Sequence, residues 1–319
     1  MKQNLKNTAT LFLLTTLFGA GCSPILAQKN LRTVTPAIER MTQTLPLVPT
    51  STINTHSISG ATLKDTLPGE PQGSSQVIHD QSSAATAKQK KAPGGDVYSL
   101  GRFERPFDQQ MVYLPALDMV RAELFRPSDG WIYFKISLEA TPAPPPAVYG
   151  VELDLNIDGR GDLLIQALAP SSKEWSEAGI KMWWDSDGDV GGRVINRSDP
   201  RKFRGSGFET LKIDSDANKS SGQIWTRLQK VPNLGMEIAM REDLIGGKDG
   251  KFSWKPYTDG VPFPPSQYDL NDYYLLEEAG SPIMGERDYP LKAVYAVDNT
   301  CKGLSGLAPS GLEQGVCPP

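Results

Sequence analysis

The chain is 319 residues long and carries 33 Lys and Arg against 37 Asp and Glu, for a formal net charge of −4. The charges are unevenly placed. Residues 1–95 contain nine basic and four acidic side chains, which leaves 24 basic and 33 acidic ones to residues 96–319. This acidic balance argues against nucleic acid or an anionic lipid surface as a partner. It suits a surface that attracts cations, and equally one that only keeps an extracellular domain soluble.

The N-terminal residues have the order of a secretory signal peptide, with two lysines in MKQNLK followed by a nearly apolar run from Thr8 to Ala20. About 13 residues are too few to span a bilayer, which needs roughly 20. The sequence LFGAGCS resembles a lipobox, which implies removal of residues 1–21 and attachment of a lipid to Cys22. We therefore expect an extracytoplasmic protein anchored to the cell membrane. The alternative is cleavage after Ala27, which would release a secreted protein.

Residues 22–95 are predicted to form a disordered tether. From Ser23 to Gly95 there is no aromatic residue, and Ser, Thr, Pro, Gln and Ala predominate. Such a stretch buries too little apolar surface to offset the entropy lost on ordering. Both histidines of the chain, His56 and His79, fall inside it. The remaining residues, 96–319, are long enough for one large β domain.

Alternation of apolar and polar residues predicts β-strands along residues 96–319. In WIYFKISL (131–138) every second residue from Ile132 is apolar, and VYGVELDLN (148–156) alternates in the same way from Tyr149. Further predicted strands cover 117–125, 162–168, 180–184, 208–213, 223–228, 236–240, 251–257 and 273–277. Turn residues separate nearly all of them, and only 241–245 resembles a helical turn. The pattern predicts an all-β fold, an antiparallel β-sandwich of the jelly-roll kind.

The three cysteines, Cys22, Cys301 and Cys317, are an odd number for an exported protein. Lipidation of Cys22 would leave a pair that lies close together in sequence in an oxidising compartment. We therefore expect a disulfide between Cys301 and Cys317 that closes a C-terminal loop of the domain. The alternative is two reduced thiols.

Three segments resemble a known group of β-sandwiches: LDMVRAELFRPSDGWIYFKISLE, GVELDLNIDGRGD and MEIAMREDLIGG. In these segments the domain resembles family 9 carbohydrate-binding modules and DOMON-like domains. The stretch from about Val97 to Pro318, which ends in EEAGSP, YPLKAVYAVDNTC and GVCP, is similar to uncharacterised bacterial surface proteins. These motifs are structural, so the resemblance implies the sandwich fold more than any activity.

One segment has the spacing of a Ca²⁺-binding loop. Its candidate ligands alternate along the chain: Asp154, Asn156, Asp158, the backbone carbonyl of Arg160, and Asp162. Gly159 permits a sharp turn, and these positions match the first nine of an EF-hand loop. Ile165 stands where that loop has its last Glu, so another segment would supply the remaining ligands. The alternative is an ordinary hairpin in which these side chains cap a tight turn.

Two later turns are also acidic. They offer Asp185, Asp187 and Asp189 in one turn and Asp214, Asp216 and Asn218 in the other. Either turn could complete the first site or hold an ion of its own, and solvated hairpin tips explain them equally well.

Trp183 and Trp184 are adjacent in a predicted strand, so their side chains should point to opposite faces of the sheet. An outward indole beside an acidic turn could stack on a sugar ring. The alternative for both residues is packing in the core or on a face of the sheet.

Residues 96–319 contain no His and no Cys beyond the predicted disulfide pair, which excludes Ser-His-Asp, Cys-His and His-ligated zinc sites. A carboxylate pair for glycoside hydrolysis would have to come from Glu152, Asp154, Glu237, Glu277 or Glu278. We expect no enzyme but a lipid-anchored binding module, stabilised by Ca²⁺, that recognises a glycan or an envelope protein. The alternatives are a structural or protein-interaction module without a small ligand, and a carboxylate-dependent polysaccharide hydrolase.

Overall fold

The structure is a computed structural model that describes residues 67–73, 75–93, 104–190, 205–217, 222–268, 274–313 and 315–317. The chain divides into two units, Met1–Ala61 and Thr62–Pro319, and all described residues belong to the second. The predicted signal peptide, Cys22 and most of the predicted tether therefore lie outside the described residues. No helix among the described residues is long and apolar enough to cross a membrane.

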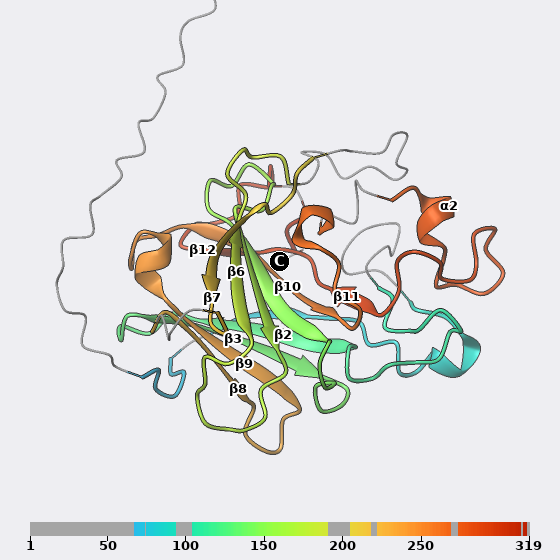
Figure 1. The fold of residues 1–319 in the computed structure, drawn as a ribbon, viewed down its shortest axis with the longest axis horizontal. Helices are drawn as coiled ribbons and strands as arrows, with labels where there is room; N and C mark the ends of the chain where they lie inside the picture. The colour runs from blue at the N-terminus through green and yellow to red at the C-terminus, as the bar shows by residue number, and fades with distance from the viewer. Residues whose placement is uncertain are drawn as a thin grey trace, which may run out of the picture. The chain divides into compact units, whose positions relative to one another are not determined.

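The fold is nearly all β, with two antiparallel sheets, as the alternation predicted (Figure 1). The five-stranded sheet has the order β1 (Ser75–His79), β2 (Met119–Phe125), β3 (Trp131–Leu138), β9 (Gly235–Arg241) and β8 (Ile224–Leu228). The seven-stranded sheet has the order β11 (Val297–Asn299), β10 (Phe252–Asp259), β4 (Val148–Asp154), β5 (Leu163–Leu168), β6 (Ile180–Trp184) and β7 (Thr210–Asp214), and β12 (Gly303–Ser305) pairs with β10. The short helices are η1 (Ala87–Gln89), η2 (Glu242–Ile245), η3 (Pro265–Gln267) and α2 (Leu276–Ala279).

The main hydrophobic core lies between the two sheets. Ile132 and Phe134 of β3 point into it, and Val151 of β4 meets them from the other sheet. The ring of Phe134 lies 5.8 Å from that of Trp254 in β10, which joins the two layers directly. Period-two alternation thus placed the core faces correctly, because side chains of a strand point alternately to its two sides.

The outer face of the seven-stranded sheet is also covered, although the alternation predicted a polar face there. All seven residues of β4 are buried. Phe208 and Tyr268, which belong to connecting segments, pack over this face, and the Tyr268 ring lies 4.6 Å from that of Tyr257 in β10. Glu152 on this face is therefore not solvated and instead pairs with Lys255.

The predicted boundary between tether and domain at residue 96 is wrong. β1, which falls inside the predicted tether, pairs with β2 along its whole length from Ser75 to His79. Ile78 is buried in the main core. The composition of residues 22–95 is that of a linker, but one buried apolar side chain and a ladder of backbone hydrogen bonds are enough to hold an edge strand in place.

The other sequence predictions of secondary structure have mixed outcomes. The predicted strands from 117–125 to 251–257 are all present, with ends shifted by at most two residues. The helical turn expected at 241–245 is η2. The strand predicted at 273–277 is wrong, because Leu276–Ala279 form α2. The short apolar run in TyrTyrLeuLeuGluGlu could not distinguish a strand from a helical turn.

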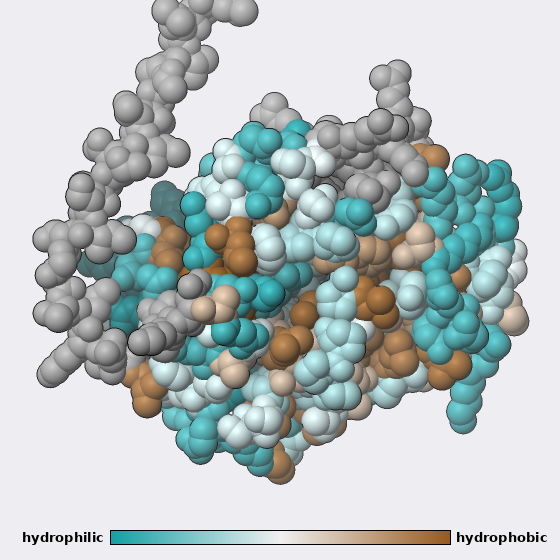
Figure 2. Space-filling view, viewed as in Figure 1, coloured by the Kyte–Doolittle hydropathy of each residue, from teal (hydrophilic) through white to brown (hydrophobic). Residues whose placement is uncertain are grey.

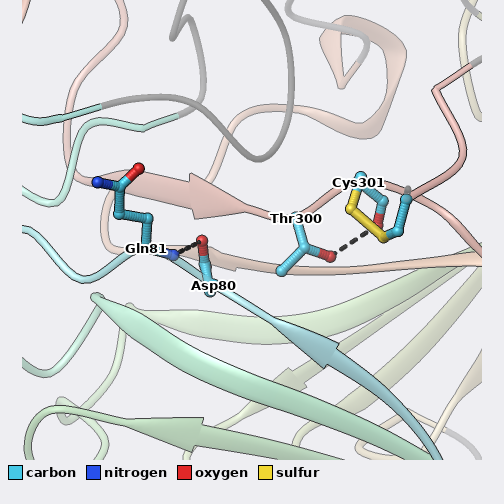
Figure 3. The surroundings of a disulfide bond; sticks show 5 residues. Asp80, Gln81, Thr300 and Cys301 are labelled. Atoms are coloured by element: carbon cyan, nitrogen blue, oxygen red, sulfur yellow. Dashed lines mark hydrogen bonds between the residues drawn. A yellow bond between two sulfur atoms is a disulfide. The ribbon is translucent and has the colours of Figure 1, made fainter. Parts of the chain in front are cut away.

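The disulfide between Cys301 and Cys317 is present, with Cα atoms 5.0 Å apart. Cys301 is buried in the main core, directly after β11 (Figure 3). On the side of the molecule seen in Figure 2, apolar and polar side chains are interspersed among the described residues and form no single large apolar face.

Candidate functional site

The first predicted Ca²⁺ loop connects β4 to β5, and its side chains bind the loop's own backbone. Asp154 accepts hydrogen bonds from the backbone N–H groups of Gly159 (2.9 Å) and Asp158 (3.3 Å). Asp162 accepts one from Leu155 at 2.6 Å. Gly159 has a φ of +95°, which is the sharp turn that the sequence predicted.

Two more of the five candidate ligands, Asn156 and Asp158, also serve the turn of this loop. Asn156 accepts a hydrogen bond from the Asp158 N–H at 2.8 Å, and the Arg160 N–H donates to Asp158 at 2.9 Å. Lys302 donates its Nζ to the Gly159 carbonyl at 2.8 Å. The loop is thus folded by its own polar groups, which is the geometry of the hairpin alternative, and Ca²⁺ binding by this loop stays a prediction.

Burial makes the negative charges of the first loop costly. It raises the pKa of Asp154 to about 6, with Asp162 and Asp158 adding to the rise and Lys302 opposing it. Burial likewise raises the pKa of Asp162. A carboxyl group whose pKa is raised prefers to be neutral, and a cation bound nearby would reverse that preference.

The second acidic loop, which follows β6, brings its carboxylates together. Oxygen atoms of Asp185, Asp187 and Asp189 all lie within 4.8 Å of one another. Asp185 is buried and accepts the Val190 N–H at 2.8 Å, while Asp189 accepts the Ser206 N–H at 2.7 Å. Burial raises the pKa of Asp185, and its contact with Asp187 contributes. Among the described residues, two groups of three acidic side chains are gathered this closely, and Asp154, Asp158 and Asp162 are not one of them.

The two acidic loops lie at the same end of the seven-stranded sheet, which we call the acidic end (residues 154–162 and 185–189). β5 lies between β4 and β6, and Leu163 at its start pairs with Trp184 at the end of β6. The loops touch through a backbone hydrogen bond from Asp185 N–H to the Asp162 carbonyl, 3.0 Å long. The register of three antiparallel strands therefore brings together two motifs that are more than twenty residues apart in sequence.

The third acidic turn is not part of the acidic end. Asp214 ends β7 and pairs with Lys181, near the opposite end of β6. Its carboxylate lies 3.6 Å from the Lys181 Nζ, and Asp216 accepts the Gly179 N–H at 3.1 Å. This turn therefore cannot complete the first loop, and Asn218 lies outside the described residues.

Trp183 and Trp184 point to opposite faces of β6, as predicted, and both are half-buried. Trp184 packs against the main core. Trp183 packs against the cluster on the outer face of the sheet and donates its Nε1 to Gln166 at 3.1 Å. Each indole thus has protein neighbours, and stacking on a sugar stays a prediction to which the geometry adds no support.

A second group of three carboxylates was not predicted from sequence. Asp80, Glu104 and Asp298 gather within 4.8 Å, and Glu104 and Asp298 are fully buried. Asp298 accepts the Met119 N–H at 2.7 Å, and Asp80 accepts the Gln81 N–H at 2.7 Å (Figure 3). These residues come from three distant segments without a common motif.

Two of the carboxylates considered for hydrolysis, Glu152 and Glu237, lie on different sheets. Glu152 pairs with Lys255 on the seven-stranded sheet, and Glu237 pairs with Arg227 on the five-stranded sheet. Glu277 lies 3.6 Å from Arg287 on the connection after α2. The structure therefore does not bring Glu152 and Glu237 together as an acid and base.

Comparison with known proteins found no matching family, no matching curated protein and no matching solved structure. Any functional conclusion therefore depends on the geometry of the chain itself.

Proposed function

We propose that this protein is an extracytoplasmic binding module, held at the membrane by a lipid on Cys22, whose acidic end binds Ca²⁺. The observation that carries the Ca²⁺ proposal is the convergence of Asp185, Asp187 and Asp189 within 4.8 Å. Ca²⁺ takes six to eight oxygen ligands, often from carboxylates, backbone carbonyls and water. The first loop adjoins this group and carries further carboxylates for the same ion or a second one.

The charge balance of the acidic end supports this proposal. Burial raises the pKa values of Asp154, Asp162 and Asp185, so these carboxylates hold their charges at a cost in folding free energy. A divalent cation that binds only the folded state would remove part of this cost and stabilise the fold by mass action. Sugar stacking by Trp183 or Trp184 is not part of the proposal, because both rings pack against protein.

Thermal melting of the full chain in EDTA and in Ca²⁺ tests the cation site. At a free Ca²⁺ concentration of about 100 times the dissociation constant, one site adds about 2.7 kcal/mol. For a domain of this size the melting midpoint should then rise by roughly 5 to 10 °C. Asp187→Asn should abolish the rise, because it removes an exposed ligand of the second loop.

The matched control is Asp216→Asn, in the acidic turn at the other end of the sheet, which should keep the full rise. Asp158→Asn tests whether the two loops bind the same ion. If this variant also loses the rise of the melting midpoint in Ca²⁺, both loops contribute to one site. A midpoint that is equal in EDTA and Ca²⁺ would rule out the cation proposal.

Mass spectrometry of the mature protein from its native host tests the anchor. The proposal expects a mature chain that begins at Cys22 and carries the mass of a diacylglyceryl group. A mature chain that begins at Gln28 would instead mean secretion without an anchor, and the Ca²⁺ proposal would stand unaffected.

A further inference from the structure

A short segment, Leu67–Gly73, crosses the outer face of the five-stranded sheet in the manner of a bound peptide. It precedes β1 and contains LeuProGlyGluProGlnGly. Both backbone polar groups of Gly69 are hydrogen-bonded. Its N–H donates to the Tyr133 hydroxyl at 3.0 Å, and its carbonyl accepts a hydrogen bond from the Trp175 Nε1–H at 3.1 Å. Pro68 is buried beside them. The side chains of Tyr133 and Trp175 therefore both bind the backbone of this segment.

The next residue, Glu70, places its carboxylate on two cations. Arg227 in β8 donates from both terminal nitrogens, Nη1 to Oε1 and Nη2 to Oε2, each at 2.8 Å. Lys230 donates to Oε1 at 2.6 Å. Two parallel hydrogen bonds from one guanidinium add geometric specificity as well as energy to the recognition of a carboxylate.

Arg227 is held in position by groups other than Glu70. Its Nε donates to Glu237 at 2.7 Å, and its guanidinium lies 4.2 Å from the centre of the Trp175 ring. The Arg227 side chain is only 4 % exposed, whereas that of Glu70 is 51 % exposed. The Arg227 guanidinium is thus fixed in the sheet, and the Glu70 carboxylate is the partner that can be exchanged.

The segment does not use every donor on this face. Trp225, which is two residues before Arg227 and therefore on the same face of β8, has a buried Nε1 without a hydrogen-bond partner among the described residues. A ligand that carried one more acceptor would satisfy it. Aromatic and Arg side chains of this kind dominate the energetics of binding sites in proteins.

We propose that Tyr133, Trp175, Trp225, Arg227 and Lys230 form a binding site for an acidic peptide, and that Pro68–Glu70 occupies it in cis. The ligand class follows from the contacts. One residue, Gly69, is bound through both its N–H and its C=O, and the Glu70 carboxylate follows one residue later. Displacement of Glu70 leaves no buried charge unpaired, because the Glu70 carboxylate is half exposed and Arg227 keeps Glu237 as its partner.

The test is fluorescence anisotropy with a labelled peptide of the sequence LPGEPQG, added to the full chain and to a Glu70→Gln variant. In the variant the resident segment loses its ion pair, so the labelled peptide should bind more tightly than to the unmodified chain, by a factor of up to about five. The matched control peptide, LPGQPQG, should bind weakly to both. Adding Arg227→Gln to the variant should abolish binding of LPGEPQG.

The resident segment could stay bound in Glu70→Gln through the hydrogen bonds of Gly69, so a second variant removes one of these as well. Gly69→Pro combined with Glu70→Gln also removes the N–H donated to Tyr133. If neither variant binds the peptide more tightly than the unmodified chain does, while both keep its melting midpoint within a few degrees, the site is purely structural and the proposal fails. Peptide binding should be equal in EDTA and Ca²⁺, so this outcome is independent of the cation site.

Discussion

The two sheets each carry a carboxylate–cation pair on their outer face, and the two pairs differ in what surrounds them. On the seven-stranded sheet, Glu152 and Lys255 lie 2.9 Å apart with side chains 7 % and 11 % exposed. On the five-stranded sheet, Glu70 lies 2.8 Å from Arg227 but remains half exposed, on a segment without regular structure. The distances are nearly equal, so burial and not geometry distinguishes them.

Burial decides which pair can be exchanged. Burial alone would raise the pKa of Glu152, yet the charges of Lys255 and Lys302 lower it, so the carboxylate stays ionised inside the protein. Removing a partner there leaves a charge without solvent, which is strongly destabilising. At Glu70, water can replace the lost partner. The first pair therefore fixes the fold, whereas the second can serve recognition.

The largest predicted effect comes from breaking the buried pair. Lys255→Met should lower the free energy of unfolding by about 3 kcal/mol, at the lower end of the range for buried pairs because Lys302 remains near Glu152. Urea unfolding measures this loss. The double variant Glu152→Gln with Lys255→Met should recover most of it, since the uncompensated charge of Glu152 is then removed. A loss under 1 kcal/mol in the single variant would contradict the difference drawn between the two faces.

How much of this could be predicted from sequence depends on the range of the interaction. Alternation in 131–138 and 148–156 identified the core faces, because the two-residue period of a strand is visible in its own sequence. It could not show that Phe208 and Tyr268 cover the polar side of β4, since those residues lie far along the chain. Tertiary contacts of this kind leave no local pattern.

The candidate sites follow the same rule. The loop at 154–162 had the better motif, and carboxylates of both loops accept backbone N–H groups. The weaker motif at 185–189 is the one that gathers its oxygens. Spacing states which oxygens are available but not whether the backbone already uses them. The pairing of Glu70 with Arg227, 157 residues apart, had no sequence signal at all, because Glu70 fell within a stretch that composition assigned to the tether.

The smallest predicted effect comes from the exposed pair and completes the comparison. Glu70→Gln should cost about 1 kcal/mol or less in unfolding free energy, because solvent screens a half-exposed carboxylate. Hydrogen bonds from Arg227 and Lys230 lower the pKa of Glu70 from 4.5 to about 2. Its contribution is therefore fully present above pH 4.5 and is lost as the pH falls towards 2.

Urea unfolding of the unmodified chain and of Glu70→Gln at pH 7 and at pH 3 checks this sign. The difference between the two proteins should be larger at pH 7, and it should also shrink in 1 M salt, where the Debye length falls to about 3 Å. A loss of several kcal/mol at pH 7 would make Glu70 as structural as Glu152. The segment Leu67–Gly73 would then be a fixed part of the fold and not an exchangeable occupant.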